Sequence, residues 1–339
     1  MKVLYSLIGV AVIVLLAILG VGSLSLNYLF GVIIPYVAAT IFIVGFVYRV
    51  IKWAVVPVPF HIPTTCGQQN SLPWIKSSRI ESPSSTAGVI GRMALEVLFF
   101  RSLFRNEKAE LKDSGKLLYG GNKFLWLGGL AFHWSLLTIL FRHSRFFLDP
   151  VPAVIKFVEN MDGILQIALP TLYLTDAVIL IALTYLFLRR VVFPQIRYIS
   201  IASDYFALLL IISVVLSGGL MRHFFKVDVV GVKELSMGLL TFNPIIPEGI
   251  GLAFYVHLFL VCSLLAYFPF SKMMHAPGIF LSPTRNMRND SRMRRYVNPW
   301  DHPVKVHTYE EYEDDFRKNM RKVGLPLDKD DEPESNQKE

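Results

Sequence analysis

Four histidines lie in or beside two long apolar stretches of the sequence. LAFHWSLLTILFRHSRFF contains His133 and His143, and YVHLFLVCSLLAYFPFSKMMH contains His257 and His275. An ionisable side chain is costly in an apolar segment of membrane length, so such residues usually carry function. A neutral imidazole can bind a metal ion or relay a proton. These four histidines are therefore the first candidates for chemistry.

The elements that would position the histidines are membrane-spanning helices. The chain has 339 residues, of which 53% are hydrophobic, and its mean hydropathy is +0.46. Soluble domains need more polar surface than this. Six apolar runs are each close to the ~20 residues that cross a bilayer. They cover residues 3–22, 27–48, 124–141, 164–188, 201–221 and 249–270. The predicted fold is an all-α integral membrane protein with six transmembrane helices, the first of which is retained and not cleaved as a signal peptide.

The distribution of basic residues predicts the orientation. Six crossings place both termini on one side, together with residues 49–123, 189–200 and 271–339, which contain 27 of the 34 Lys and Arg. The positive-inside rule then predicts a multi-pass protein of the cytoplasmic membrane with both termini in the cytoplasm. The net charge of +8 follows mostly from this topology and does not argue for nucleic-acid binding.

The predicted topology places the histidines at two depths. The third span runs outward, so His143 is outer and His133 inner, whereas the sixth runs inward, so His257 is outer and His275 inner. Two b-type haems with bis-histidine ligation need such pairs at matched depths on two antiparallel helices. The outer pair would be His143 with His257, and the inner pair His133 with His275. The alternative is four isolated polar residues bonded to carbonyls or lipid headgroups.

Two straight helices would not bring both pairs level. Ten residues rise about 15 Å along an α-helix and eighteen rise about 27 Å. Pro269 lies between His257 and His275 and is expected to kink or end the sixth span. Ten residues also leave His133 and His143 roughly 80° apart around their helix. The two haem planes therefore need not be parallel.

Small and basic residues beside the histidines have two interpretations each. Glycines either admit a flat macrocycle or allow close helix packing; they are Gly128, Gly129, Gly218 and Gly219. Basic residues either bind haem propionates or extend to the membrane interface; they are Arg142, Arg145 and Lys272. The two cysteines, Cys66 and Cys262, form no CxxC or CxxCH motif, so this chain alone holds no iron–sulfur cluster and no c-type haem.

The predicted organisation has four parts. They are two N-terminal helices (1–51), a cytoplasmic loop (52–123), a di-haem four-helix bundle (124–275) and a cytoplasmic tail (276–339) whose last part has a disordered composition. In the loop, SPSSTAGVIGRMALEVLFFRSLFRN has helical apolar spacing after a candidate N-cap, Ser85 or Thr86. This amphipathic helix either lies on the cytoplasmic leaflet or docks a cytoplasmic partner.

Three segments carry a family resemblance. FHWSLLTILFRH, LFLRRVVFPQIR with the following SDY span, and YVHLFLVCSLLAYFPFSKMMH resemble the gamma (cytochrome b) subunit of respiratory nitrate reductase over most of residues 120–280. The extra first span, the loop IPTTCGQQNSLPWIKS and the ending FPFSKMMHAPGIFLSPTRNMRND are more similar to another family. That family contains the cytochrome b subunit of the Dsr membrane complex of sulfate and sulfite reducers, with an archaeal relative in a heterodisulfide-reductase-like menaquinol-oxidising complex.

The resemblance implies a nitrate-reductase-gamma-like di-haem helical bundle with two haem b groups, in an enzyme complex that oxidises quinol. Menaquinol would be oxidised near the outer face and release two protons there. Electrons would pass from the haem of His143 and His257 to the haem of His133 and His275. The implied acceptor is a cytoplasmic iron–sulfur subunit resembling heterodisulfide reductase, which acts on a small sulfur-carrier protein in sulfite or sulfur-carrier reduction. Further membrane and extracytoplasmic redox subunits are expected.

The quinone-binding residues depart from this pattern. The nitrate reductase relative uses a lysine on the outer loop before its fourth span, whereas FVENMDGILQIALP here offers Asp162 and Gln166. A quinol base must lie within hydrogen-bond reach of the quinol hydroxyl. The candidates are Asp162 and His223, followed in rank by Lys156 and Lys233.

Two more acids lie in predicted spans. Asp176 in LYLTDAVIL belongs either to a proton path or to a hydrogen-bonded helix contact. Asp204 lies at the inner start of the fifth span, where a carboxylate suits the helix dipole.

Two other functional classes compete with quinol oxidation. One is a haem-containing membrane anchor without its own quinone chemistry, and the other is a transporter or channel whose histidines relay protons. Transporters tend to contain internal repeats and broken helices, and the sequence has no repeat of fixed period. A reducible b-type absorbance would exclude the transporter, and haem reduction by a menaquinol analogue would exclude the anchor.

Overall fold

The computed structural model describes residues 1–57, 68–111, 116–165, 171–290, 292 and 305–329. Its contacts divide the chain into two units, Met1–Ser291 and Arg292–Glu339, and each is described by itself. The α-helices of the first unit are α1 (Lys2–Ala17), α2 (Ile34–Ala54), α3 (Thr86–Phe99), α4 (Arg101–Phe104), α5 (Lys123–His143), α6 (Ala153–Asp162), α7 (Leu174–Val192), α8 (Pro194–Ile199), α9 (Ala202–Leu220), α10 (Val229–Leu240), α11 (Leu252–Tyr267), α12 (His275–Gly278) and α13 (Pro283–Asn286). Short π-helical turns are η1 (Ile18–Ser23), η2 (Leu29–Ile33) and η4 (Met221–Phe225), and 3₁₀ turns are η3 (Ser144–Phe146), η5 (Phe268–Phe270) and η6 (Lys272–Met274).

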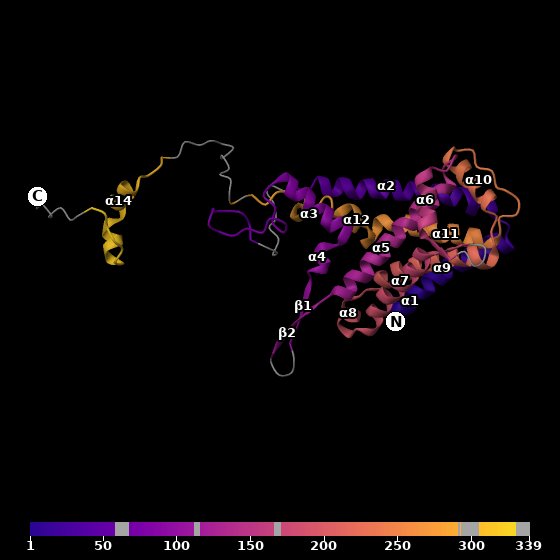
Figure 1. Ribbon diagram of the computed structural model, residues 1–339, viewed down its shortest axis with the longest axis horizontal. Helices are drawn as coiled ribbons and strands as arrows, with labels where there is room; N and C mark the ends of the chain where they lie inside the picture. The colour runs from indigo at the N-terminus through magenta and orange to yellow at the C-terminus, as the bar shows by residue number, and fades with distance from the viewer. Residues whose placement is uncertain (58–67, 112–115, 166–170, 291, 293–304, 330–339) are drawn as a thin grey trace, which may run out of the picture. The chain divides into compact units, whose positions relative to one another are not determined.

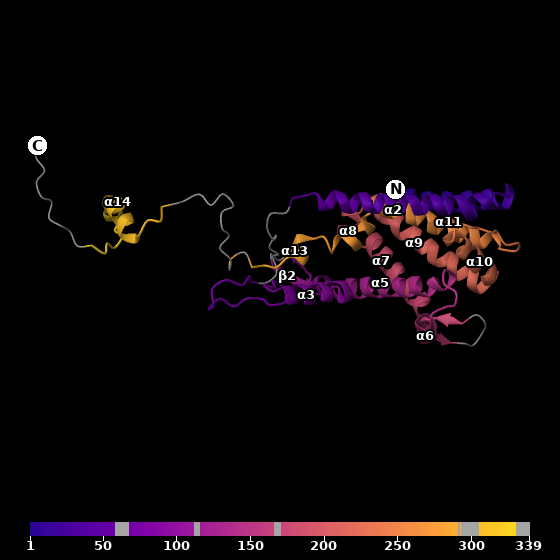
Figure 2. The same ribbon diagram turned by 90° about the horizontal axis from the view of Figure 1, so that it is seen from above.

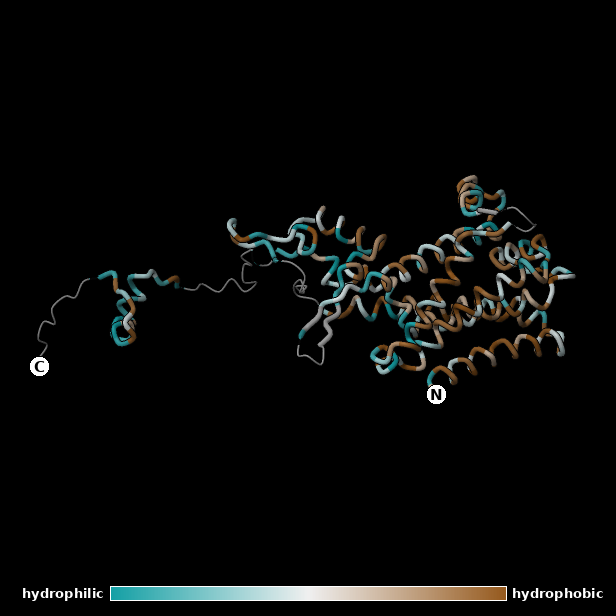
Figure 3. Tube along the Cα trace, turned by 60° about the horizontal axis from the view of Figure 1, so that its bottom comes forward, coloured by the Kyte–Doolittle hydropathy of each residue, from teal (hydrophilic) through white to brown (hydrophobic). Residues whose placement is uncertain are grey.

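The prediction of an all-α membrane protein is confirmed. Within the described residues, five helical segments are long and apolar enough to cross a membrane. They are Lys2–Ser23, Leu29–Ala54, Lys123–Phe146, Ala202–Phe225 and Leu252–Phe270. Many of their large apolar side chains face outward, as lipid contact requires, and Figure 3 shows the hydrophobic course of the first helix from the N-terminus. The chain is a multi-pass membrane protein.

The fourth predicted span begins later than expected. Residues 164–188 were expected to be helical, but α7 begins at Leu174 and contains three charged residues, Asp176, Arg189 and Arg190. Before it, β3 (Gly163–Leu165) and β4 (Leu172–Tyr173) form a short antiparallel hairpin. The Asp162 carboxylate accepts the backbone N–H of Thr175 at 2.9 Å, in the first turn of α7. This carboxylate satisfies one of the free N–H groups of the helix start, which explains why the helix begins there.

The spans pack in a continuous order. Helix α5 packs against α7, α7 against α9, and α9 against α11. The two N-terminal helices cover α11, and α1 also packs along α9. Figure 2 shows α2 along one edge and α5 along the opposite edge, with α9 and α7 between them. Phe132, Ile179 and Leu183 fill the contact of α5 with α7, so the histidine-bearing helix α5 is held by an apolar core.

The sixth span ends where the proline predicts. Helix α11 stops at Tyr267 and is followed by the 3₁₀ turn containing Pro269. Ser271 is extended, and a second 3₁₀ turn leads to His275, the first residue of α12. The segment from His257 to His275 is therefore not one straight helix, as Pro269 predicts.

The segment that precedes α5 contains α3, α4 and a β-hairpin. Ser85 caps α3, since its hydroxyl accepts the N–H of Gly88, so of the two predicted N-caps Ser85 is the one used. The strands β1 (Glu107–Leu111) and β2 (Leu117–Gly121) form an antiparallel hairpin that leads into α5. Figure 1 shows α3 and α8 towards one end of the helix bundle and α6 and α10 at the other.

The second unit contains α14 (Tyr309–Lys322). Thr308 and Glu311 form a reciprocal capping box at its start. Glu313 is fully buried, and its carboxylate accepts the backbone N–H groups of Asp328 and Lys329. An ordered helical element is therefore present in the predicted tail.

Candidate functional site: two histidine pairs in the helix bundle

The inner pair lies between α5 and the segment after α11. The ring centres of His133 and His275 are 5.9 Å apart, and the ring planes make an angle of 85°. The Phe100 ring meets His133 edge to face at 4.9 Å, from the junction of α3 and α4. The junction of α3 and α4 therefore reaches the inner pair directly.

The indole groups of α5 hold that junction in place. Trp126 donates from Nε1 to the carbonyl oxygen of Phe99 at 2.7 Å, and Trp134 donates to that of Leu98 at 3.0 Å. Phe100 itself has a φ of 51°, a left-handed conformation that is uncommon for an aromatic residue. The two indole contacts and the Phe100 backbone fix the end of α3 against the inner pair.

The outer pair lies between α5 and α11. His143 is the last residue of α5 and His257 is one to two turns inside α11. A carbon atom added at Gly218 of α9 would lie 3.3 Å from Cε1 of His257. The backbone of α9 thus borders the outer pair closely.

All four imidazoles have the same nitrogen engaged. Nδ1 contacts an oxygen at 2.7–2.9 Å in each case. The partners of His133, His143 and His275 are backbone carbonyl oxygens, which can only accept. Nδ1 therefore carries the proton and Nε2 carries the lone pair. Metal-binding histidines are usually oriented in this way, with the second nitrogen donating to a carbonyl.

The spacing of the inner pair suits a metal ion held by two imidazoles. A metal bound to two imidazole nitrogens at about 2 Å each holds the ring centres roughly 6 Å apart, and His133 and His275 are 5.9 Å apart. The two Nε2 atoms are left for the metal by the hydrogen bonds at Nδ1. These residues fit a bis-histidine haem.

The glycines beside the histidines differ in role. A carbon added at Gly128 would lie 2.7 Å from the Tyr185 ring, so this glycine serves the contact of α5 with α7. Gly129 provides the carbonyl that accepts from His133. Gly218 faces His257, while a carbon added at Gly219 meets no described atom within 4 Å. Of the four predicted glycines, Gly218 is the one that limits space beside an outer ligand.

An ionic cluster lies at the end of α5, where Arg142 directly precedes His143. Arg142 is 7% exposed and pairs with Asp162 of α6 at 3.0 Å and with Asp176 of α7 at 2.8 Å. The Asp162 contact is an ion pair without hydrogen-bond alignment at the arginine Nε. The Tyr173 ring lies between two guanidinium groups, with Arg142 at 3.7 Å and Arg222 at 4.3 Å. Two aspartates therefore neutralise Arg142, and Arg222 contacts the same tyrosine ring and the carbonyl oxygen of Thr171.

The predicted quinone candidates are dispersed around this cluster. Asp162 belongs to it, and both its oxygens also accept from Thr175. Lys233 pairs with Asp149 at 3.0 Å, and Lys156 is exposed on α6. His223 is half-buried in the π-turn that follows α9. Gln166 lies outside the described residues, as does Cys66.

A second ionic group lies beside the inner pair. Asp204, at the start of α9, pairs with Lys272 at 2.7 Å and accepts the backbone N–H of Ile201. The carbonyl oxygen of Lys272 accepts from Nδ1 of His275 at 2.8 Å. Asp204 thereby anchors the turn that carries an inner histidine, in addition to the predicted effect on the dipole of α9.

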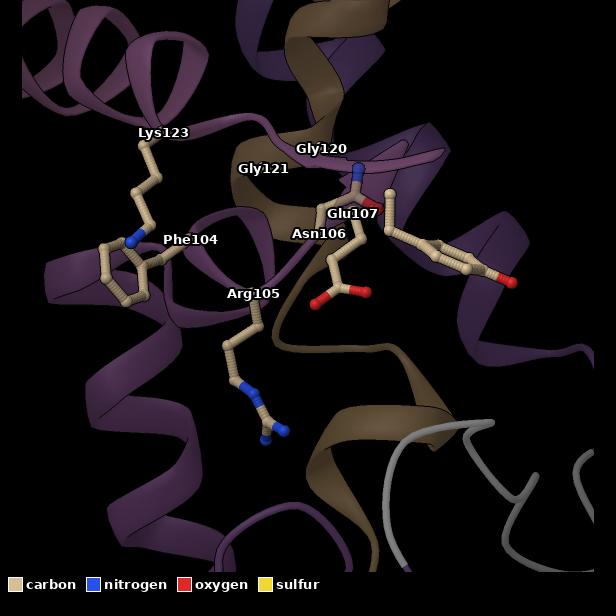
Figure 4. A pocket seen from close by; sticks show the side chains of 8 residues that line it. Phe104, Arg105, Asn106, Glu107, Gly120, Gly121 and Lys123 are labelled. Carbon is tan, nitrogen blue, oxygen red and sulfur yellow. The ribbon is translucent and has the colours of Figure 1, made fainter. Parts of the chain in front are cut away.

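The concavity in Figure 4 is a separate feature. It has a volume of about 320 Å³ and is lined by α4, the β1–β2 hairpin and the first residue of α5. Lys123 lies over the Phe104 ring at 5.3 Å there. None of its lining residues is a histidine, so it is no part of the two pairs.

Comparison with known proteins identifies the family. Residues 89–295 match the family described as the nitrate reductase gamma subunit. The chain belongs to this family. A protein of Archaeoglobus fulgidus named "Hdr-like menaquinol oxidoreductase cytochrome b-like subunit" is 47% identical over 285 residues, which are 81% of this chain and 84% of that protein. A protein of Archaeoglobus profundus with the same name is 42% identical over 275 residues, covering 79% and 81% respectively. The similarity found in the histidine segments therefore extends over most of the chain.

Three contributors to the site carry no signal in the sequence alone. Ser217 contacts His257, Thr175 binds Asp162, and Phe100 covers His133. Each lies 13 to 40 residues of sequence from its partner, and serine, threonine and phenylalanine are common in membrane helices. Only the packing of the helices reveals them.

Proposed function

We propose that this chain is the di-haem b-type membrane subunit of a complex that oxidises menaquinol. The main support is the orientation of four imidazoles, with Nδ1 bonded to oxygen and Nε2 free to bind iron. The relatives named menaquinol oxidoreductase cytochrome b-like subunits support the substrate. His143 with His257 would hold the outer haem, and His133 with His275 the inner haem.

The residues of the chain have distinct tasks in this function. The haems supply one-electron redox chemistry when bound. The carbonyls of Gly129, Ile139 and Lys272 and the hydroxyl of Ser217 orient the four imidazoles. The apolar cores around the bundle exclude water from the path between the pairs.

The proposed direction is from the outer face to the cytoplasm. Menaquinol would give up two protons at the outer end, and its electrons would leave at the inner end to an iron–sulfur subunit resembling heterodisulfide reductase. That subunit would serve sulfite or sulfur-carrier reduction, within a complex of further membrane and extracytoplasmic redox subunits. In this proposal the partner would approach Phe100 and the α3–α4 junction, because Phe100 contacts His133.

The spectrum of the purified full chain tests the proposal. Two b-type haems that a menaquinol analogue reduces are the expected result. His143→Ala should remove one haem and leave the other, whereas His307→Ala, a histidine of the second unit, should retain both. Full occupancy of both haems in His143→Ala would contradict the ligand pairing. Haems that dithionite reduces but quinol does not would favour the membrane anchor without quinone chemistry.

A further inference from the structure

Quinol oxidation needs a base at the outer histidine pair, and this inference rests on the proposed function. The base must carry a free lone pair, be reachable from the membrane and lie near His143 or His257. A lysine ammonium has no lone pair to accept a proton. Lys233 is in addition held by Asp149 at 3.0 Å. The basic candidates are therefore poor proton acceptors.

Asp162 is already fully used by the fold. Its Oδ1 accepts from the backbone N–H of Thr175 at 2.9 Å, and its Oδ2 accepts from the Thr175 hydroxyl at 2.6 Å. In addition, Nε of Arg142 lies 3.0 Å from Oδ2. The side chain is only 5% exposed. Asp162 stabilises the start of α7 and holds Arg142, so a quinol hydroxyl would have to displace these partners.

Asp176 differs from Asp162 in each of these respects. Its Oδ1 accepts from Arg142 at 2.8 Å, and no partner of Oδ2 is found among the described residues. Its side chain is 33% exposed. It lies in the first turn of α7, where the helix dipole favours the carboxylate.

Arg142 holds this carboxylate in a fixed position. The guanidinium is shared between Asp162 and Asp176 and lies over the Tyr173 ring at 3.7 Å. Its neighbour in sequence is His143, an outer ligand. The same buried arginine therefore ties the carboxylate of α7 to the end of α5, beside the outer pair. Arg142 thus holds the Asp176 carboxylate through Oδ1, and Oδ2 is suited to accept a proton.

We propose that Asp176 is the residue that accepts a hydroxyl proton from menaquinol at the outer histidine pair. The quinol O–H bond breaks and a new O–H bond forms at Oδ2 of Asp176. The second quinol proton passes to water at the outer face. The two electrons released with the two protons go to two equivalents of ferric haem, the oxidant that the proposed function supplies, and the quinol becomes the quinone.

Stopped-flow reduction of the haem-loaded full chain by a reduced short-chain menaquinone analogue tests this assignment. Asp176→Asn keeps the shape and the contact with Arg142 but cannot accept the proton, so haem reduction should slow by about 100-fold or more. Asp176→Glu should recover part of the rate. Glu159→Gln removes an outer carboxylate that pairs with Arg145 and should leave the rate unchanged.

Haem content and the dithionite-reduced spectrum are measured on every variant, so loss of folding is separated from loss of proton transfer. A normal quinol rate in Asp176→Asn with full haem content would overturn the assignment. A loss in His223→Gln with a normal rate in Asp176→Asn would assign the base to His223 instead. Absence of quinol reduction in the wild-type chain would refute the proposed function and not this residue alone.

Discussion

Ser217 of α9 accepts a hydrogen bond from Nδ1 of His257 in α11 at 2.9 Å. The same hydroxyl donates to the carbonyl oxygen of Val214 at 2.9 Å. Its single hydrogen is therefore used, and towards the imidazole it can act only as an acceptor. The other three histidines rely on a backbone carbonyl of their own segment, whereas His257 relies on a side chain of another helix.

Replacing Ser217 should alter one haem selectively. Ser217→Ala removes the acceptor of the His257 Nδ1 proton, and such outer partners tune the basicity and orientation of a ligand. The midpoint potential and low-spin electron paramagnetic resonance signal of one haem should shift while those of the other stay constant. Ser217→Thr should restore them. Ser263→Ala, which removes a hydroxyl bonded within α11 to Phe259, should change neither haem. Two unaltered haems in Ser217→Ala would contradict the role.

The spans and the four histidines could be predicted because both signals are local. Long apolar runs identify the helices, and Pro269 predicts the break before His275. The start of α7 could not be predicted in this way. It depends on Asp162, which lies 13 residues before Thr175 and contacts it across the paired strands β3 and β4. Hydropathy included that hairpin in the span because its residues are apolar.

The division of roles among the outer acids was likewise hidden. The sequence places Asp162 in the predicted outer loop and Asp176 inside the predicted fourth span, and it makes only Asp162 a quinone candidate. Their difference arises from Thr175, which takes both oxygens of Asp162 and leaves Asp176 to Arg142. The sequence does not show that Asp162 binds both the buried Arg142 and the start of α7, whereas Asp176 pairs with Arg142.

Asp162→Asn should destabilise the fold more than it affects the haems. The variant keeps the shape of the side chain but removes one of two negative partners of the buried Arg142. Breaking a buried ion pair costs about 3–5 kcal/mol, and the remaining Asp176 places the expected loss in the free energy of unfolding near the lower limit. Thermal unfolding in detergent measures it. The half-exposed pair of Arg145 and Glu159 provides the control, since Glu159→Gln should cost less than about 1 kcal/mol. Equal losses in the two variants would contradict the structural role of Asp162.

The segment before α5 should become less stable in acid. Burial alone would raise the pKa of Glu81, but hydrogen bonds from Arg105 and Arg101 outweigh it and hold the pKa below its ordinary value of 4.5. A carboxyl with a lowered folded-state pKa contributes stability above its unfolded-state pKa. This contribution is lost as the pH falls through the folded-state value.

Thermal unfolding of Glu81→Gln against wild type checks this sign. The variant should have the lower midpoint at neutral pH, and the two curves should converge below pH 4.5, where the wild-type carboxyl gains its proton. A difference that stays constant over the whole range would show that Glu81 acts through its shape and not through its charge.

Two adjacent glycines of α9 allow a matched test of space at the outer pair. A carbon added at Gly218 would lie 3.3 Å from Cε1 and 3.7 Å from Nδ1 of His257, whereas one added at Gly219 meets no described atom within 4 Å. Gly218→Ala should push the His257 ring and change the spectrum or the occupancy of one haem, with the other unaltered. Gly219→Ala should leave both haems as in wild type, because the added carbon meets no described atom. It is a matched control, since both substitutions change the helix propensity by the same amount. Equal spectra in the two variants would mean that His257 is not held against α9, and the hydrogen bond from His257 to Ser217 would then lose its structural basis.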